Sequence, residues 1–244
     1  MGRRLAAVGH LEVAPEVPHA LIFGASGAIG GAVADTLAQA GFTVHGTSRG
    51  GGGETIALDP VGAPDGLAAL DDLPALDAVV WAQGANRNDA AGTVQREDFE
   101  AVMAANVTYV VITLAHLVTT ERLAKPARMV VISSIWEQVA RPGKFSYTVS
   151  KAAIGGLVRA ASVDLAADGH LINAVGPSVT DTPMTRSMLS AEQIDGVASQ
   201  TGFGRLTSLG DVAGLTAHLC SAANTGVTGQ SIAVDLGFSH ARAL

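Results

Sequence analysis

The stretch "HALIFGASGAIGGAVADTLAQAG", residues 19 to 41, decides the fold. A short apolar run ends in Gly24, and apolar residues then recur at Ile29, Val33 and Leu37, which share one face of a helix. A glycine follows the last apolar turn, where glycine commonly ends a helix. The stretch therefore predicts a buried strand, a glycine-rich turn and an amphipathic helix.

The same alternation continues to the end of the chain. Apolar runs predict strands at residues 19–24, 42–48, 54–58, 76–82, 127–134, 170–176 and 230–235, and helices near 28–41, 97–118, 147–167 and 210–221. Alternating strands and helices indicate a parallel sheet that is covered on both faces. We therefore expect a Rossmann-type, doubly wound α/β fold of about seven strands. No linker or repeat divides residues 19–244, so a single domain is expected after a loose leader over residues 1–18.

Composition excludes several classes of partner. The 244 residues carry a net charge of −7 and no lysine-rich run, which argues against nucleic acid. Cys220 is the only cysteine, so no internal disulfide can form, and a cytoplasmic location is expected. The seven histidines show no metal-ligand spacing, and no metal site is predicted. The apolar stretch near the N-terminus is too short for a signal peptide, and no membrane partner is expected.

One predicted helix, residues 97–118, is apolar nearly all round. Such a helix must be buried on more than one side. Either its own loops cover the outer face, or a second subunit does. The small residues of the helix at 147–167 would permit close approach, and we predict a homodimer or homotetramer through these two helices.

The turn "GASGAIG", residues 24 to 30, lies between a strand and a helix, where glycines and a helix N-terminus can receive a pyrophosphate. The second strand ends in "VHGTSRGGG", with Ser48 and Arg49 and no carboxylate before Glu54. An arginine suits a 2′-phosphate, whereas an acidic residue would suit the ribose hydroxyls of NAD. NADP(H) is therefore favoured as cofactor and NAD(H) remains possible, as does a solvated turn arginine.

A tyrosine stands four residues before a lysine in "SYTVSKAAI", residues 146 to 154. In a helix, Tyr147 and Lys151 lie on one face, one turn apart. The pKa of an ordinary tyrosine, near 10, is too high for ready proton exchange at neutral pH, and a nearby ammonium lowers it. The pair is therefore a candidate acid/base group with its activator, although chance alone can place two such residues together.

Six landmarks in order resemble the single-domain branch of the short-chain dehydrogenase/reductase family. They are "GASGAIG", Asn106, "VVISS" ending at Ser134, "YTVSK", "NAVGPSVTDTPM" and "TGQSIAVDLG". The resemblance implies that Tyr147 exchanges the proton of a substrate carbonyl or alcohol, that Ser134 binds the substrate oxygen, and that Asn106 holds a water of a proton relay. It also implies that Lys151 binds the nicotinamide ribose. The implied cofactor contacts are Gly24, Ser26, Ile29, Gly30, Ser48, Arg49, Asp59, Gly84, Tyr147, Lys151, Pro177, Thr180 and Thr182.

The sequence departs from the family pattern in three places. The usual "NNAG" after the fourth strand is "WAQG" at residues 81–84, the middle glycine of the nucleotide turn is Ala28, and Ser178 replaces a glycine. The segment after Asp59 is short and poorly helical, which suggests a trimmed crossover.

The expected function is an NADP(H)-dependent oxidoreductase that interconverts a ketone and a secondary alcohol. An NAD-dependent dehydrogenase of a secondary alcohol, polyol or sugar, and a non-catalytic dinucleotide sensor, are the alternatives.

Overall fold

The computed structural model describes residues 17–53 and 55–240, so most of the expected leader lies outside the described residues. The strands are β1 (His19–Phe23), β2 (Thr43–Ser48), β3 (Thr55–Ala57), β4 (Leu76–Trp81), β5 (Leu123–Ile132), β6 (Leu171–Pro177) and β7 (Ser231–Val234). The α-helices are α1 (Ala28–Gln39), α2 (Arg96–Met103), α3 (Tyr109–Thr119), α4 (Phe145–Asp164), α5 (Pro183–Met188), α6 (Ala191–Ala198) and α7 (Leu209–Cys220). Short 3₁₀ helices are η1 (Pro64–Leu70), η3 (Ile135–Glu137) and η4 (Ala166–Asp168), and η2 (Ala104–Thr108) is a π-helical turn.

All seven strands form one parallel sheet in the order β3-β2-β1-β4-β5-β6-β7, as predicted. The chain runs outward from β1 to β2 and β3, then returns to β4 on the other side of β1. This reversal makes the carboxyl ends of β1 and β4 the switch point, where ligands bind in doubly wound sheets. Only η1 connects β3 to β4, which confirms the expected trimmed crossover.

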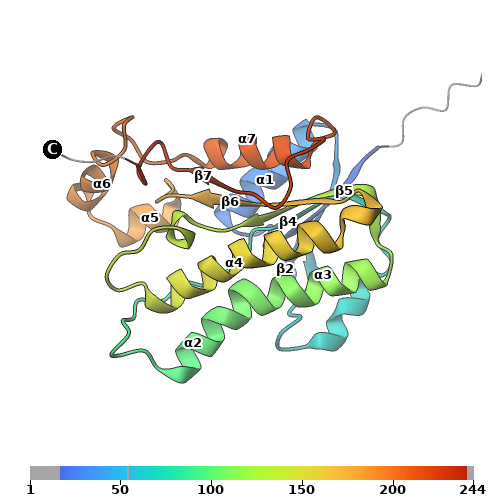
Figure 1. Ribbon diagram of the computed structural model, residues 1–244, viewed down its shortest axis with the longest axis horizontal. Helices are drawn as coiled ribbons and strands as arrows, with labels where there is room; N and C mark the ends of the chain where they lie inside the picture. Colours follow the sequence, from blue (N-terminus) through green and yellow to red (C-terminus); the bar gives the residue numbers. More distant parts are fainter. Residues whose placement is uncertain (1–16, 54, 241–244) are drawn as a thin grey trace, which may run out of the picture.

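Helices cover both faces of the sheet (Figure 1). On one face, α1 and α7 pack on a core that includes Val33, Leu37, Val80 and Val212. On the other face, α3 and α4 cover a second core that is centred on Trp81 and its ring contact with Phe23. Because both faces are covered, the strands are apolar along most of their length.

The structure differs from the sequence-based expectation in three regions of the chain. The predicted helix 97–118 is one continuous column with a π-helical turn at Ala104–Thr108, between α2 and α3. Strand β5 begins at Leu123, four residues earlier than predicted, because Leu76 pairs with Leu123 before a register shift. Helices α5 and α6 were not predicted, since each is too short to show an apolar period.

Within the described residues, Arg96–Thr119 meets the length and composition of a membrane-spanning helix, and an 18-residue window within it has a mean hydropathy of 1.8. This is weak evidence, since a helix that packs in the core of a soluble protein meets the same criteria. Here α3 contributes Val110 and Leu117 to the core beneath the sheet. The absence of a membrane partner stays a prediction.

Candidate active site

The turn between β1 and α1 depends on two glycines. Gly24 has a φ of +79°, and a Cβ there would lie 2.7 Å from the backbone nitrogen of Gln83. A Cβ on Gly30 would lie only 2.2 Å from the carbonyl oxygen of Gly24. Because neither glycine has a side chain, the start of α1 can approach the ends of β1 and β4. The replacement of the family's middle glycine by Ala28 falls at the first residue of α1, outside this contact.

We expect Gly30→Ala to destabilise the fold by about 1–3 kcal/mol, since the added methyl group overpacks a backbone contact. It should also weaken dinucleotide binding, because α1 must move away from the turn. Gly31→Ala is the matched control, since its Cβ would lie at an ordinary 3.5 Å from the carbonyl oxygen of Ala25. Urea unfolding and NADPH titration of both variants measure the difference. Equal stability and equal affinity of the two variants would contradict the tight turn.

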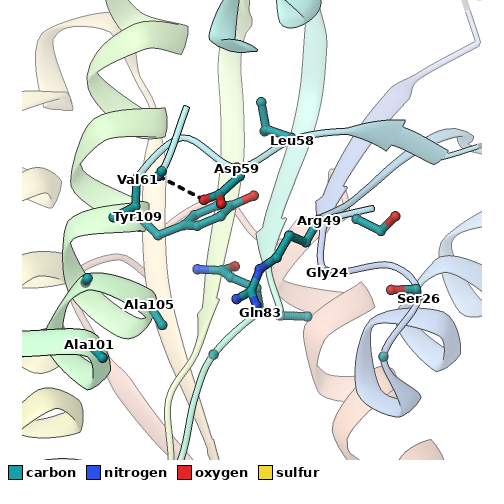
Figure 2. A pocket seen from close by; sticks show the side chains of 16 residues that line it. Gly24, Ser26, Arg49, Leu58, Asp59, Val61, Gln83, Ala101, Ala105 and Tyr109 are labelled. Atoms are coloured by element: carbon teal, nitrogen blue, oxygen red, sulfur yellow. Dashed lines mark hydrogen bonds between the residues drawn. The ribbon is translucent and has the colours of Figure 1, made fainter. Parts of the chain in front are cut away.

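A cavity of about 520 Å³ opens at the switch point (Figure 2). Six of the predicted cofactor residues line it: Gly24, Ser26, Ser48, Arg49, Asp59 and Gly84. The structure also places Gly27, Leu58, Val61, Gly62, Ala82, Gln83, Ala101, Ala104, Ala105 and Tyr109 in the wall. The cavity therefore joins the carboxyl ends of β1, β2 and β4 to the column formed by α2, η2 and α3.

The polar side chains that β2 and β3 bring to the cavity differ in whether they are free to bind a ligand. The Arg49 side chain extends into the cavity (Figure 2), and among the described residues no hydrogen bond or ion pair engages it. The Ser48 hydroxyl, in contrast, lies 2.9 Å from Thr55 Oγ1 at the start of the neighbouring strand β3. Asp59 accepts a hydrogen bond from the Gly62 N–H at 3.1 Å, which fixes its carboxylate in the wall. Arg49 is thus the cation that remains for a ligand.

Gln83 and Tyr109 belong to the cavity wall and were not among the predicted cofactor residues. The Gln83 Oε1 atom is buried and has no hydrogen-bond partner within the described part of the chain. A buried acceptor without a partner is costly, so a ligand that donates a hydrogen bond there is favoured. This free acceptor, the glycine turn and Arg49 fit the hydroxyl and phosphate groups of a dinucleotide. The only sequence signal for Gln83 was the departure "WAQG".

Tyr147 lies in the first turn of α4 and shares a hydrogen bond with the Ser134 hydroxyl at the carboxyl end of β5. The Ser134 Oγ atom also lies 3.5 Å from the Pro177 carbonyl oxygen and accepts from the Trp136 N–H at 3.3 Å. Burial raises the pKa of Tyr147 above its ordinary value, and the hydrogen bond to Ser134 lowers it by less. The net direction is opposite to the sequence-based expectation, because burial outweighs the neighbouring polar groups.

Lys151 follows Tyr147 by one helical turn, as predicted. Its Nζ atom lies 5.6 Å from the centre of the Tyr147 ring and donates a hydrogen bond to the Ile132 carbonyl oxygen at 2.9 Å. Burial lowers the pKa of Lys151 to about 8, while the carboxylate of Glu137 opposes this shift. Glu137 itself accepts a hydrogen bond from the Ser133 hydroxyl at 2.7 Å.

Asn106 lies in the π-helical turn η2, and such turns are frequent at functional sites. Its side-chain amide accepts from the Ala85 N–H at 2.7 Å and donates to the Ala85 carbonyl at 2.9 Å and to the Ser150 hydroxyl at 2.8 Å. Asn106 therefore braces the chain after β4, where the family's asparagines are missing. The position of Asn106 also explains why residue 84 is a glycine, because a Cβ there would lie 2.8 Å from Asn106 Oδ1.

The remaining predicted residues lie at the carboxyl end of β6 and in α1. Pro177 ends β6, and the Thr182 hydroxyl caps α5 by accepting from the Thr185 N–H at 3.1 Å. The Ile29 side chain packs against the core beside α1.

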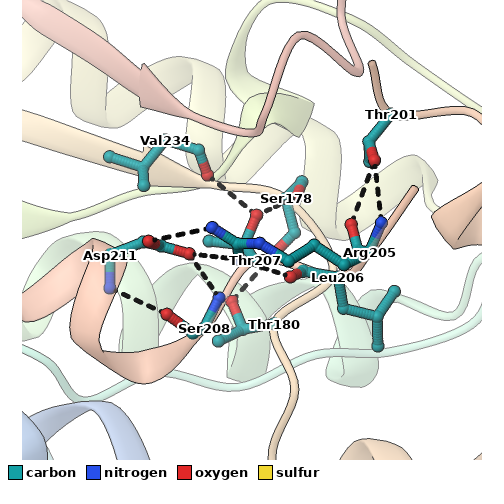
Figure 3. Close-up of polar contacts among 9 residues, drawn as sticks. All are labelled: Ser178, Thr180, Thr201, Arg205, Leu206, Thr207, Ser208, Asp211 and Val234. Carbon is teal, nitrogen blue, oxygen red and sulfur yellow. Dashed lines mark hydrogen bonds and ion pairs between the residues drawn. The ribbon is translucent and has the colours of Figure 1, made fainter. Parts of the chain in front are cut away.

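Residues 178–211 close the same end of the sheet through a polar network (Figure 3). Ser178 Oγ lies 2.7 Å from Thr207 Oγ1, and Thr180 forms an isolated β-bridge with Thr207. Arg205 donates a hydrogen bond to Asp211 at 2.7 Å at the start of α7. Both ends of the segment that carries α5 and α6 are thus joined. Ser178, where the family has glycine, contributes the hydroxyl of one link.

Asn106, Ser134, Tyr147 and Lys151 thus gather at the ends of β4 and β5, beside the cavity. Among the described residues, no group of three or more His, Cys, Asp or Glu side chains is arranged to hold a metal ion. The fold and the glycine turn define the class of Rossmann-type dinucleotide-binding proteins.

Comparison with known proteins narrows this class. A family model described as enoyl-(acyl carrier protein) reductase matches residues 67–239. The chain is 26% identical to 3-oxoacyl-(acyl-carrier-protein) reductase of Vibrio cholerae, over 89% of this chain and 96% of that protein. It is 28% identical to glucose 1-dehydrogenase of Gluconobacter oxydans, over 90% and 91% of the two chains. A solved gluconate 5-dehydrogenase of Burkholderia cenocepacia, in complex with NADP and tartrate, superposes with a TM-score of 0.84 at 25% identity, over 92% of this chain and 96% of that chain.

The chain therefore belongs to the short-chain dehydrogenase/reductase family, and it is an NAD(P)-dependent oxidoreductase.

Proposed function

We propose that the protein is an NADP(H)-dependent oxidoreductase that interconverts a ketone and a secondary alcohol, with Tyr147 as the general acid/base. The observation that carries this proposal is the hydrogen bond between Ser134 and Tyr147, with the Lys151 ammonium 5.6 Å from the same ring. This group lies next to a cavity that fits a dinucleotide. A non-catalytic sensor would need the cavity but would have no use for the serine, tyrosine and lysine together.

Each side chain has a role in this proposal. A nicotinamide cofactor held in the cavity by the glycine turn and Arg49 would supply or accept the hydride at the substrate carbon. Ser134 donates a hydrogen bond to the carbonyl oxygen and orients it toward Tyr147. Tyr147 delivers its proton to the same oxygen as negative charge develops there. The Lys151 ammonium stabilises the resulting phenolate, and Asn106 holds the chain after β4 in place beside the site.

The raised pKa of Tyr147 supports the reductive direction. At neutral pH the phenol is protonated and Lys151, with a pKa of about 8, is mainly charged. A protonated phenol can donate, whereas alcohol oxidation requires a phenolate at the start. The similarity to glucose 1-dehydrogenase keeps the oxidation of a sugar or polyol as the second candidate. Incubation with NADPH and ketones, and with NADP⁺ or NAD⁺ and polyols, separates the two by nicotinamide absorbance.

Arg49 supports NADP(H) over NAD(H), as does NADP in the solved gluconate 5-dehydrogenase. We expect Arg49→Gln to lower kcat/KM for NADPH by about ten- to hundredfold, since a hydrogen bond between charged groups contributes about 1.5–3 kcal/mol. The value for NADH should change little. Arg96→Gln is the control, because Arg96 pairs with Glu100 at the surface. A native enzyme that prefers NADH, and that Arg49→Gln leaves unchanged, would favour the NAD-dependent alternative.

We also propose a homodimer or homotetramer through the column of α2, η2 and α3 together with α4. Both elements expose large apolar side chains, namely Val111 and Val118 on α3 and Val149 and Val163 on α4. Light scattering at two protein concentrations tests the assembly. The cytoplasmic location stays a proposal, supported by the single, buried, unpaired Cys220.

A further inference from the structure

Lys144 is a buried cation beside Tyr147 that the proposed reaction does not use. It precedes α4 directly, and only 7% of its surface is exposed. Its Nζ atom lies 5.9 Å from the centre of the Tyr147 ring. Lys151 follows Tyr147 by one turn and Lys144 precedes it by three residues, so two ammonium groups lie near the same ring.

Within the described residues Lys144 forms no direct ion pair, although the Asp89 carboxylate acts on its charge electrostatically. Its Nζ atom donates hydrogen bonds to Asn86 Oδ1 at 2.8 Å and to Asn88 Oδ1 at 2.6 Å, and both acceptors are neutral amides. Asp89, the adjacent carboxylate, is occupied by the backbone N–H of Ser146 at 2.9 Å and by the Ser146 hydroxyl. An ammonium has three donors, so one N–H of Lys144 remains. A buried charge that forms no direct ion pair is costly, and an anionic ligand in contact with it would relieve that cost.

A second cation lies at the same place. Arg141 is exposed, stacks its guanidinium 5.7 Å from the centre of the Trp136 ring, and is close enough to act electrostatically on Lys144. The two cations come from the segment after β5, and the two asparagines from the segment after β4. The carboxyl ends of these strands form the crevice in which a substrate must reach Tyr147.

We propose that Lys144, assisted by Arg141, binds a carboxylate on the substrate, so that the ketone reduced by this enzyme is a keto acid. This inference rests on the proposed reductase function and names its substrate class. The carboxylate would accept the remaining N–H of Lys144 while the carbonyl oxygen meets Ser134 and Tyr147. Lys144 and Tyr147 are three residues apart at the start of α4. The carboxylate of the substrate should therefore lie only a few atoms from its carbonyl carbon.

The test compares straight-chain keto acids with their methyl esters, with the carbonyl one to four carbons from the carboxyl group. Each pair has the same carbonyl and differs in charge. With NADPH, the native enzyme should reduce the best acid with a kcat/KM about ten- to hundredfold above its ester, as expected for a hydrogen bond between charged groups. Lys144→Met should remove this preference, mainly through KM, and Lys144→Arg should restore part of it.

The controls separate recognition from a structural role. If Lys144 only fastens the chain after β4 to α4, Lys144→Met will lower activity on acid and ester equally, and this result would overturn the inference. Arg141→Met, at an exposed position, should reduce the acid preference several-fold even if Lys144→Met folds poorly. Lys125→Met, at a surface lysine paired with Asp168, should change nothing.

Failure of the inference differs from failure of the reductase assignment. Reduction of neutral ketones without any preference for the acids would overturn the keto-acid class and leave the reductase intact. NADPH binding with no reduction of any acid, ester or neutral ketone would overturn both.

Discussion

Tyr147→Phe should reduce kcat for ketone reduction by about 10²- to 10⁴-fold, the contribution of a positioned general acid. The variant lacks only the hydroxyl that shares a hydrogen bond with Ser134. The ring stays, so α4 and the two ammonium groups beside the ring keep their packing. The affinity for NADPH should change little, because the cavity wall does not include this hydroxyl.

Steady-state kinetics and NADPH fluorescence titration measure the two quantities separately. The matched control is Tyr109→Phe, which removes the other tyrosine hydroxyl of the chain, in the cavity wall. Tyr109→Phe should keep kcat within a few-fold. If Tyr147→Phe kept most of the native kcat, another group would have to deliver the proton, and the assigned role of Tyr147 would be wrong.

Lys151→Met should have the second-largest effect, a fall in kcat of about 10²-fold or more. The substitution removes the ammonium that stabilises the phenolate of Tyr147, and a charge interaction in a buried site is worth several kcal/mol. It also leaves the buried Ile132 carbonyl oxygen without its donor, so a loss of stability of about 1–3 kcal/mol is expected as well. Urea unfolding distinguishes this loss from the loss of activity.

The pH dependence gives an independent test of Lys151. Its pKa is lowered to about 8, so its charge is present below pH 8 and disappears above it. The pKa of Tyr147 is raised, so its proton remains throughout this range. Ketone reduction by the native enzyme should therefore be constant below pH 8 and decline above it. A rate that stayed constant through pH 10 would contradict the role of the ammonium.

The same pKa shift predicts a change in stability. Between pH 8 and about 10.5, the folded state binds fewer protons at Lys151 than the unfolded chain does. The contribution of this residue to the free energy of unfolding therefore rises with pH in that window. Lys151→Met should remove this rise, and Lys125→Met should not.

The sequence predicted the sheet because its signals are local. Each strand is a short apolar run, and the turn at Gly24 and Gly30 has its own pattern of small residues. The same holds for Tyr147 and Lys151, which one helical turn brings together. The π-helical turn around Asn106 has no such local pattern, since Ala104–Thr108 reads as ordinary helix.

The residues that sequence reasoning missed depend on contacts between distant segments. Lys144 meets Asn86 and Asn88 across 58 and 56 positions of the chain, and no pattern near Lys144 indicates this contact. The direction of the Tyr147 pKa also depends on burial, which becomes known only when the surrounding segments are in place. The neighbouring lysine alone had suggested the opposite direction.

The most direct test of the central claim follows the hydride itself. NADPH that carries deuterium at C4 of the nicotinamide, at each of its two positions in turn, is incubated with the native protein and a panel of ketones and keto acids. The proposed function predicts an alcohol with deuterium at the former carbonyl carbon, from one of the two labelled cofactors only. Tight binding of NADPH with no labelled alcohol from any carbonyl compound would contradict it and would favour a dinucleotide sensor.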